Sequence, residues 1–202
     1  MQESAVVCLG EALALVPGLP AAGAEPDPNT AHLAGAEANV AAGLAAAGVS
    51  AAWVGRLGTD ALGEFLLAQL RARGIETGGV LRDPTRPTGY YAKQVEPGDP
   101  EPRTRMLYRR SGSAASAMDP AFLDEPTVAG RLASARLVHT SGITAALSDS
   151  CAAFMRALLG RPRDTSEDAV VDNTMQLLRV IGSPGFPMDE ALVRERVRTA
   201  TR

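Results

Sequence analysis

The sequence is poor in the residues that most often build metal, disulfide and nucleic-acid sites. Its two cysteines, Cys8 and Cys151, are far apart and match no metal-ligand spacing. Two reduced thiols are the simpler interpretation, and a disulfide stays open. Lys93 is the only lysine and the net charge is −3, so the chain lacks the basic surface that nucleic-acid binding requires.

Long apolar runs are also missing. No stretch of about 18 uninterrupted apolar residues occurs, so we expect no membrane-spanning helix. The N-terminal "MQESAVVCLG" lacks the basic start and apolar core of a signal peptide, and we expect a cytoplasmic protein. With 46% hydrophobic and 21% charged residues among 202, the composition is typical of a globular protein.

The N-terminal part of the chain alternates between short apolar runs and helical patterns. The expected strands are 5–10, continued through "EALALVPGL", and 50–58; the expected helices are 36–47 and about 60–73. Thr59 or Asp60 caps the second helix, and Gly48 and Gly74 end the two helices. This β-α-β-α order predicts a parallel sheet covered by helices.

The middle of the chain has a different pattern. Two aromatic-bearing strand candidates, "TGYYAKQV" at 88–95 and "RTRMLYRR" at 103–110, are separated by the turn-rich "EPGDPEP". We expect a hairpin over about 88–110, inserted into the α/β domain as a lid or a dimer flap. A helix over "EPTVAGRLASA", a buried strand at 136–142 and a helix at 146–160 follow.

The alternation stops after Gly160, where the next strand is due. Instead "RPRDTSEDAVVDNTMQLLRVIG" has a helical pattern, "SPGFP" interrupts it, and "MDEALVRERVRTATR" predicts a last charged helix. The sequence therefore predicts two parts: a domain over 1–160 with its lid at about 88–110, and an atypical helical tail over 161–202.

Several segments in this order resemble the ribokinase (PfkB) family of carbohydrate kinases. "AGAEANVAAGLAAAG" precedes "WVGRLGTDALGEFLLAQLRARGI", which contains a G-x-D-x-x-G at Gly58, Asp60 and Gly63. "GEALALVP" at 10–17, "TGYYAK" at 88–93, "YRRSGSAAS" at 108–116 and "HTSGIT" at 139–144 are similar to the 2-keto-3-deoxygluconate kinases. The resemblance implies a ribokinase-like parallel sheet with helices on both faces and a small β lid, here truncated and followed by a helical C-terminal tail.

The resemblance also implies a substrate site. Its residues are Gly35, Asn39, Tyr91, Tyr108, Arg110 and Ile143. The small residues around Gly35 let the backbone reach the sugar, while Asn39 offers a donor and an acceptor to a hydroxyl. The tyrosines would face the sugar from the lid, Arg110 would bind the substrate carboxylate, and Ile143 would line the same pocket.

Several of these residues, and other polar residues near them in the sequence, also have a purely structural interpretation. Asn39 and Asp60 are residue types that stabilise a helix start, and Tyr90 and Tyr91 alternate on a strand, so one of them packs in the sheet. Arg109 and Arg110 suit a solvated edge, and His139 within its apolar strand suits a structural role. Glu11 follows the first strand, where α/β ligands gather, and equally suits a buried polar residue with a backbone partner.

The part of the family's pattern that performs the chemistry is absent from these 202 residues. The family's G-A-G-D-like motif, whose Asp is the base, does not occur, and neither does the D-x-N-x-R segment. ATP and Mg²⁺ are implied by the resemblance, but their binding site and the catalytic residues are not in this sequence. Residues after about 163 resemble an α/β-hydrolase segment without its G-x-S-x-G motif, which suggests either fused gene fragments or an artefact of sequencing or assembly.

Three functions are compatible with these observations. The first is a kinase for 2-keto-3-deoxygluconate or a related sugar acid, inactive in this truncated chain. The second is a non-catalytic module that binds a sugar or dimerises, and the third is a nonfunctional fusion fragment. The expected partners are a small sugar acid and a second copy bound through the lid, with neither nucleic acid nor membrane.

Overall fold

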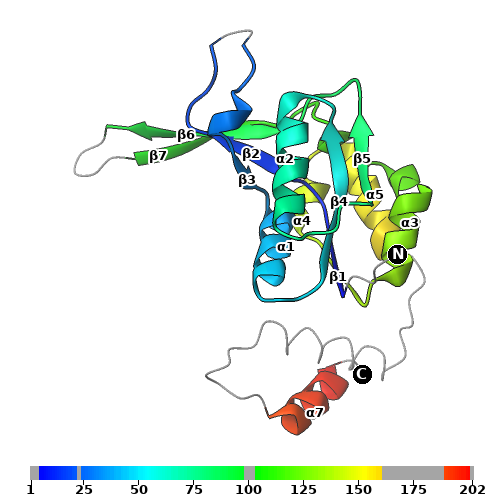
Figure 1. Ribbon diagram of the computed structural model, residues 1–202. Helices are drawn as coiled ribbons and strands as arrows, with labels where there is room; N and C mark the ends of the chain where they lie inside the picture. Colours follow the sequence, from blue (N-terminus) through cyan, green and yellow to red (C-terminus); the bar gives the residue numbers. More distant parts are fainter. Residues whose placement is uncertain (1–4, 22–23, 98–102, 161–188, 201–202) are drawn as a thin grey trace. The chain divides into compact units, whose positions relative to one another are not determined.

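The computed structural model describes residues 5–21, 24–97, 103–160 and 189–200 (Figure 1). The chain divides into two compact units, Met1–Leu159 and Gly160–Arg202. In the second unit the charged segment forms helix α7 (Glu190–Ala200), as predicted. The helical pattern expected before it, "RPRDTSEDAVVDNTMQLLRVIG", lies outside the described residues.

The first unit is built on a parallel sheet of four strands in the order β5-β4-β1-β8. These strands are β1 (Val6–Leu9), β4 (Ala51–Gly58), β5 (Val80–Asp83) and β8 (Leu137–His139). Each pair is parallel, which confirms the predicted sheet. Strand β5 was not predicted, because four residues with mixed exposure carry little periodic signal.

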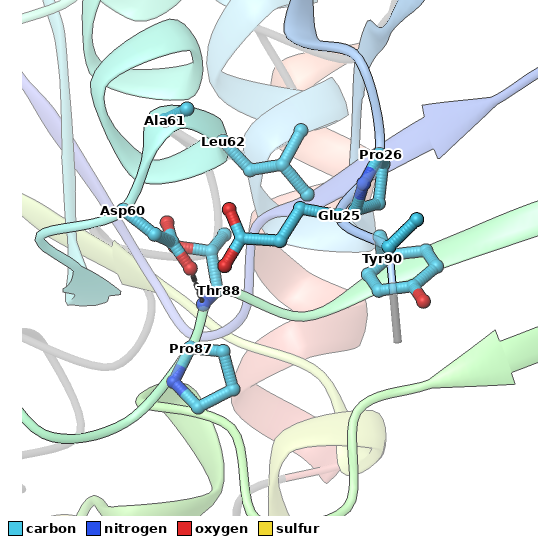
Figure 2. A pocket seen from close by; sticks show the side chains of 9 residues that line it. Glu25, Pro26, Asp60, Ala61, Leu62, Pro87, Thr88 and Tyr90 are labelled. Carbon is cyan, nitrogen blue, oxygen red and sulfur yellow. Dashed lines mark hydrogen bonds between the residues drawn. The ribbon is translucent and has the colours of Figure 1, made fainter. Parts of the chain in front are cut away.

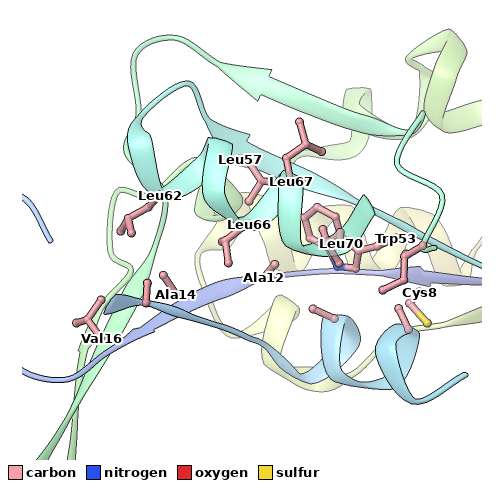
Figure 3. Packing of buried hydrophobic residues seen from close by; sticks show 14 of the residues in the cluster. Cys8, Ala12, Ala14, Val16, Trp53, Leu57, Leu62, Leu66, Leu67 and Leu70 are labelled. Carbon is pink, nitrogen blue, oxygen red and sulfur yellow. The ribbon is translucent and has the colours of Figure 1, made fainter. Parts of the chain in front are cut away.

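Helices cover both faces of this sheet, as predicted, because successive side chains of a strand point to opposite sides. Val6 and Cys8 pack in one cluster with residues of α1 (Ala36–Ala46) and α2 (Ala61–Ala72) (Figure 3). Val7 and Leu9 pack in the other with α3 (Pro126–Ser134) and α5 (Asp149–Leu159). The cysteines thus lie in different clusters, both are buried, and no disulfide joins them in this fold.

A second sheet, in the order β3-β2-β6-β7, extends away from the first (Figure 1). Its strands are β2 (Leu13–Val16), β3 (His32–Ala34), β6 (Tyr90–Glu96) and β7 (Arg103–Arg109). Strands β6 and β7 pair antiparallel from Tyr90 opposite Arg109 to Glu96 opposite Arg103. The hairpin predicted for 88–110 is confirmed.

The expectation that the first strand continues through "EALALVPGL" is wrong. Strand β1 ends at Leu9, and after Gly10 to Ala12 the chain begins β2, which belongs to the other sheet. A Cβ at Gly10 would lie 2.5 Å from the Glu37 side chain, and the Gly10 N–H donates to the Val54 carbonyl at 3.0 Å. Position 10 therefore requires a glycine, because a side chain there would collide with buried Glu37 from α1.

The remaining elements of the first unit are short. They are the 3-10 turns Pro28–Thr30, Ala115–Ala117 and Pro120–Asp124, and helix α4 (Gly142–Ala145). No helix among the described residues has both the length and the apolar character needed to cross a membrane.

The G-x-D-x-x-G motif has a structural role at the start of α2. Asp60 Oδ1 accepts a hydrogen bond from the Gly63 N–H at 2.8 Å, and its Oδ2 accepts one from the Thr88 N–H at 2.6 Å. A Cβ on Gly63 would collide with the Gly58 carbonyl, so the helix can approach the strand only at a glycine. The structural interpretation of Asp60 as a helix cap is confirmed, and Asp60 also fixes the segment that leads into the lid.

Asp83, at the end of β5, fixes the loop before this segment. It is 4% exposed; Thr85 donates to its Oδ1 from N–H at 2.9 Å and from Oγ1 at 2.8 Å, and the Arg86 N–H donates at 3.0 Å. Burial by itself would raise the pKa of Asp83, but these hydrogen bonds outweigh it and lower the pKa to about 2. The folded state therefore favours the ionised carboxylate.

We expect Asp83→Asn to lower the free energy of unfolding at pH 7 by about 2 kcal/mol. Because folding lowers the pKa of Asp83, its ionised carboxylate contributes fully to the free energy of unfolding above about pH 4. This contribution disappears as the pH falls toward 2. Urea unfolding of both proteins at several pH values measures it. As a control, Glu64→Gln, which removes an exposed ion pair, should change the free energy of unfolding by less than about 0.5 kcal/mol. An effect of Asp83→Asn that does not depend on pH would contradict the argument.

Candidate functional site

The candidate site lies where the link between the two sheets, the start of α1 and the base of the lid hairpin meet. Gly35 precedes α1 with φ 117° and ψ 140°, a conformation that side chains rarely adopt. A Cβ here would lie 2.6 Å from the Glu11 carbonyl oxygen and 2.9 Å from Ala12 Cα. Gly35 is therefore required both by its dihedral angles and by the close approach of the backbone of the link.

Glu11 in this link is buried and pairs with Arg110, which follows strand β7. Arg110 Nη1 donates to Glu11 Oε2 at 3.3 Å; the side chains are 27% and 2% exposed. Burial raises the pKa of Glu11 to about 7, a rise that Arg110 opposes and Glu37 reinforces. The structural interpretation of Glu11 as a buried polar residue holds, but its partner is a side chain rather than the backbone.

Glu37, in the first turn of α1, is a second buried carboxylate. Its Oε1 accepts hydrogen bonds from the Ser141 N–H at 2.9 Å and Oγ at 2.6 Å, and from Thr144 Oγ1 at 3.4 Å. These donors lie after β8 and in α4, more than one hundred residues along the chain. Glu37 thus joins the Gly35 turn to the segment that carries Ile143.

The two lid tyrosines contact each other at the base of the hairpin. The rings of Tyr91 and Tyr108 stack with centroids 5.3 Å apart and planes at 27°, and the Arg110 guanidinium carbon lies 5.1 Å from the Tyr108 ring centre. Burial raises the pKa of Tyr91, and Tyr108 adds to the rise. Tyr90, on the opposite face of the strand, packs against the core cluster, so the alternation of this pair is as predicted.

The structure brings together four of the six predicted site residues. Tyr108 contacts both Tyr91 and Arg110, and Gly35 is linked to them through Glu11. Ile143 is 43% exposed, beside the donors that hold Glu37. Asn39 lies exposed in α1, and its side chain takes part in no hydrogen bond among the described residues. Its place in the site stays a prediction.

Sequence reasoning missed the side-chain partner of Glu11 and the role of Glu37. Each has an oxygen without a hydrogen-bond partner among the described residues, Glu11 Oε1 and Glu37 Oε2, although both side chains are almost completely buried. The signal that could have found Glu37 is a carboxylate in an otherwise Ala- and Gly-rich helix start, since such a charge must acquire donors from elsewhere.

A cavity of about 150 Å³ lies on the α2 side of the lid base, lined by Glu25, Asp60, Thr88 and Tyr90 among others (Figure 2). Both Asp60 oxygens in it already accept backbone hydrogen bonds, so this carboxylate is committed to the fold. Among the described residues, no three His, Cys, Asp or Glu side chains are grouped as a metal site would require.

Comparisons with known proteins match this chain to one family and to several relatives. The sequence profile described as "pfkB family carbohydrate kinase" matches residues 4–176. A 2-dehydro-3-deoxygluconokinase of Thermoproteus tenax is 36% identical over 140 residues, which are 68% of this chain and 41% of that protein. The protein of the same name from Bacillus subtilis is 35% identical over 144 residues, 69% of this chain and 41% of its own.

A solved structure also resembles the chain along most of its length. The PfkB protein from Polaromonas sp. JS666 is 31% identical with a TM-score of 0.60, over 95% of this chain and 72% of that one. The chain spans about two fifths of the length of the two curated relatives.

Proposed function

Because the chain belongs to the pfkB family of carbohydrate kinases, we propose that its first unit binds 2-keto-3-deoxygluconate, or a closely related sugar acid, for phosphorylation by ATP. Two relatives are named for the kinase of this compound. The observation that carries the proposal is the Arg110 guanidinium, held by buried Glu11 and placed beside the Tyr108 ring. A guanidinium recognises a carboxylate, the group that distinguishes a sugar acid from a neutral sugar.

In this proposal each of the six predicted residues makes a different contact with the ligand. The Gly35 turn lets the backbone approach the sugar, and the stacked tyrosines offer an aromatic wall and hydroxyl groups from the lid. Asn39 is proposed to contact a sugar hydroxyl and Ile143 to supply an apolar contact. In this arrangement the lid orients the sugar, and the carboxylate of the ligand, bound to Arg110, determines which end of the sugar faces Arg110.

ATP and Mg²⁺ enter the proposal as requirements of the family's reaction. The described residues hold no cluster of metal-ligating side chains, and the sequence contains no G-A-G-D-like turn. We therefore assign no step of phosphoryl transfer to residues of this chain. The 202-residue polypeptide alone is expected to bind the sugar acid without transferring phosphate, because base and anion hole supply most of the catalysis of this reaction.

Calorimetry of the purified 202-residue chain tests the proposal with 2-keto-3-deoxygluconate and, separately, with ATP. We expect saturable binding of the sugar acid, weaker binding of its neutral analogue 3-deoxyfructose, and no product when both substrates are present. Tight ATP binding with phosphate transfer would overturn the expected inactivity. No sugar binding at all would favour the alternatives of a dimerisation module or a nonfunctional fragment.

We also propose a homodimer formed through the lid. Val95 is 64% exposed and Met106 43% exposed on the hairpin, and a second copy would cover these apolar side chains. Sedimentation of the same preparation distinguishes a dimer from a monomer. The two free, buried thiols support the proposal that the protein works in the reducing cytoplasm.

A further inference from the structure

Glu11 is the buried group at the candidate site to which the proposed function gives no role beyond holding Arg110. It lies in the link between the two sheets, directly behind Arg110, with its side chain 2% exposed. Its Oε2 is bound by the guanidinium, whereas Oε1 has no hydrogen-bond partner among the described residues. A Cβ added to Gly89, just before β6, would lie 3.5 Å from this Oε1 and 3.3 Å from Arg110 Cβ, so the backbone here packs closely against the pair.

The charged and titratable groups around Glu11 come from three elements. Arg110, after β7, is the cation and lowers the pKa of Glu11; Glu37, from α1, is a second carboxylate that raises it. Cys151, from α5, interacts electrostatically with Glu11, and burial keeps the pKa of this thiol raised. When Glu11 is ionised, the Glu11–Arg110 pair is therefore neutral as a unit, with one further carboxylate beside it.

An anionic ligand changes this balance. A sugar-acid carboxylate bound to Arg110 places a second negative charge on the one guanidinium that compensates buried Glu11. With Glu11 ionised, the unit of ligand, guanidinium and Glu11 would carry a net charge of one negative unit beside Glu37, in surroundings that already disfavour charge. If Glu11 binds one proton from solvent, the unit stays neutral, and Arg110 keeps its remaining N–H donors for the ligand.

We propose, on the basis of the proposed function above, that Glu11 positions Arg110 and binds a proton from solvent when the carboxylate of a sugar acid binds the same guanidinium. In the free protein the ionised Glu11 holds the guanidinium in place through its Oε2. In the complex Glu11 is protonated and neutral, so the ligand carboxylate alone balances the positive charge of Arg110. The site thereby favours anionic over neutral sugars by an amount that depends on pH.

The proposal predicts a proton uptake that calorimetry measures directly. Because the pKa of Glu11 in the free protein is about 7, a rise of about one unit on binding gives uptake of about half a proton per ligand at pH 7.5. The affinity for 2-keto-3-deoxygluconate should rise about fivefold from pH 8 to pH 6 by the same linkage. Its own carboxylate is ionised throughout this range and contributes no proton.

The experiment is a titration of the wild-type chain with 2-keto-3-deoxygluconate in phosphate and in Tris at pH 7.5, repeated at pH 6 and 8. The binding enthalpy should differ between the two buffers in proportion to the protons taken up. The neutral 3-deoxyfructose should give the same enthalpy in both. Glu11→Gln should abolish the buffer dependence and reduce the pH dependence of the affinity to less than about twofold.

Glu64→Gln is the matched control, since Glu64 forms an exposed ion pair with Arg82 at 2.7 Å and is outside the site. It should retain the wild-type proton uptake. Sugar-acid binding without proton uptake in the wild-type chain would overturn the inference and leave the proposed function intact, even if Glu11→Gln fails to fold. Absence of binding at every pH would overturn both.

Discussion

Gly35→Ala is expected to abolish sugar-acid binding and to lower the free energy of unfolding by about 3 kcal/mol or more. The methyl group would meet the Glu11 carbonyl oxygen at 2.6 Å and Ala12 Cα at 2.9 Å, and these are backbone atoms that cannot rotate away. The φ angle of 117° adds strain for any residue with a side chain. Relief of the contact must move the link that carries Glu11, and with it the partner of Arg110.

Gly43→Ala provides the comparison within the same helix. Nothing lies within 4 Å of a Cβ at Gly43, so this change should stabilise the helix by about 0.5–1 kcal/mol and leave binding unchanged. Urea unfolding and calorimetric titration of the two variants measure both effects. Wild-type stability in Gly35→Ala would show that the backbone can open here at little cost, and would contradict the assigned role of the turn.

The sequence was sufficient to predict the elements whose signal is local. The parallel sheet followed from the alternation of apolar runs and helical patterns, and the lid from two aromatic-bearing strands around a turn-rich segment. The division of the N-terminal run between two sheets could not be predicted. The "EALALV" segment contains no breaker, and the contact that makes a glycine necessary at Gly10, with the side chain of Glu37, exists only in the folded protein.

The electrostatics of the site could not be predicted from the sequence, for a related reason. Glu37 depends on donors at Ser141 and Thr144, and Glu11 on Arg110, so each carboxylate acquires its partner only when the fold is complete. A pattern can place a carboxylate near the end of a strand, but burial and partners decide its pKa. The same residues explain why a carboxylate stands among small neighbours: the small side chains admit the link, and Glu37 joins the helix start to α4.

Arg110→Met is expected to weaken binding of 2-keto-3-deoxygluconate by about 3 kcal/mol, on the order of 100-fold in Kd. Methionine keeps much of the apolar stem, so the variant removes the charge and the N–H donors more than the packing. The binding loss comes from the ligand carboxylate, which loses its charge-assisted hydrogen bonds; Glu11 loses its cation in the free and the bound protein alike, which affects stability instead. The neutral 3-deoxyfructose lacks the carboxylate and should lose less than about threefold.

Arg109→Met tests whether the loss of sugar-acid affinity in Arg110→Met is specific to the site or results from removing any positive charge on the lid. Arg109 is the adjacent residue, exposed, and its guanidinium donates only to the Tyr108 carbonyl among the described residues, at 3.2 Å. Calorimetry should find its affinity for both sugars within about twofold of wild type. An equal loss in the two arginine variants would mean that charge on the hairpin attracts the sugar acid at long range. A large loss in Arg110→Met alone, confined to the acid, would place the carboxylate on the guanidinium that Glu11 holds.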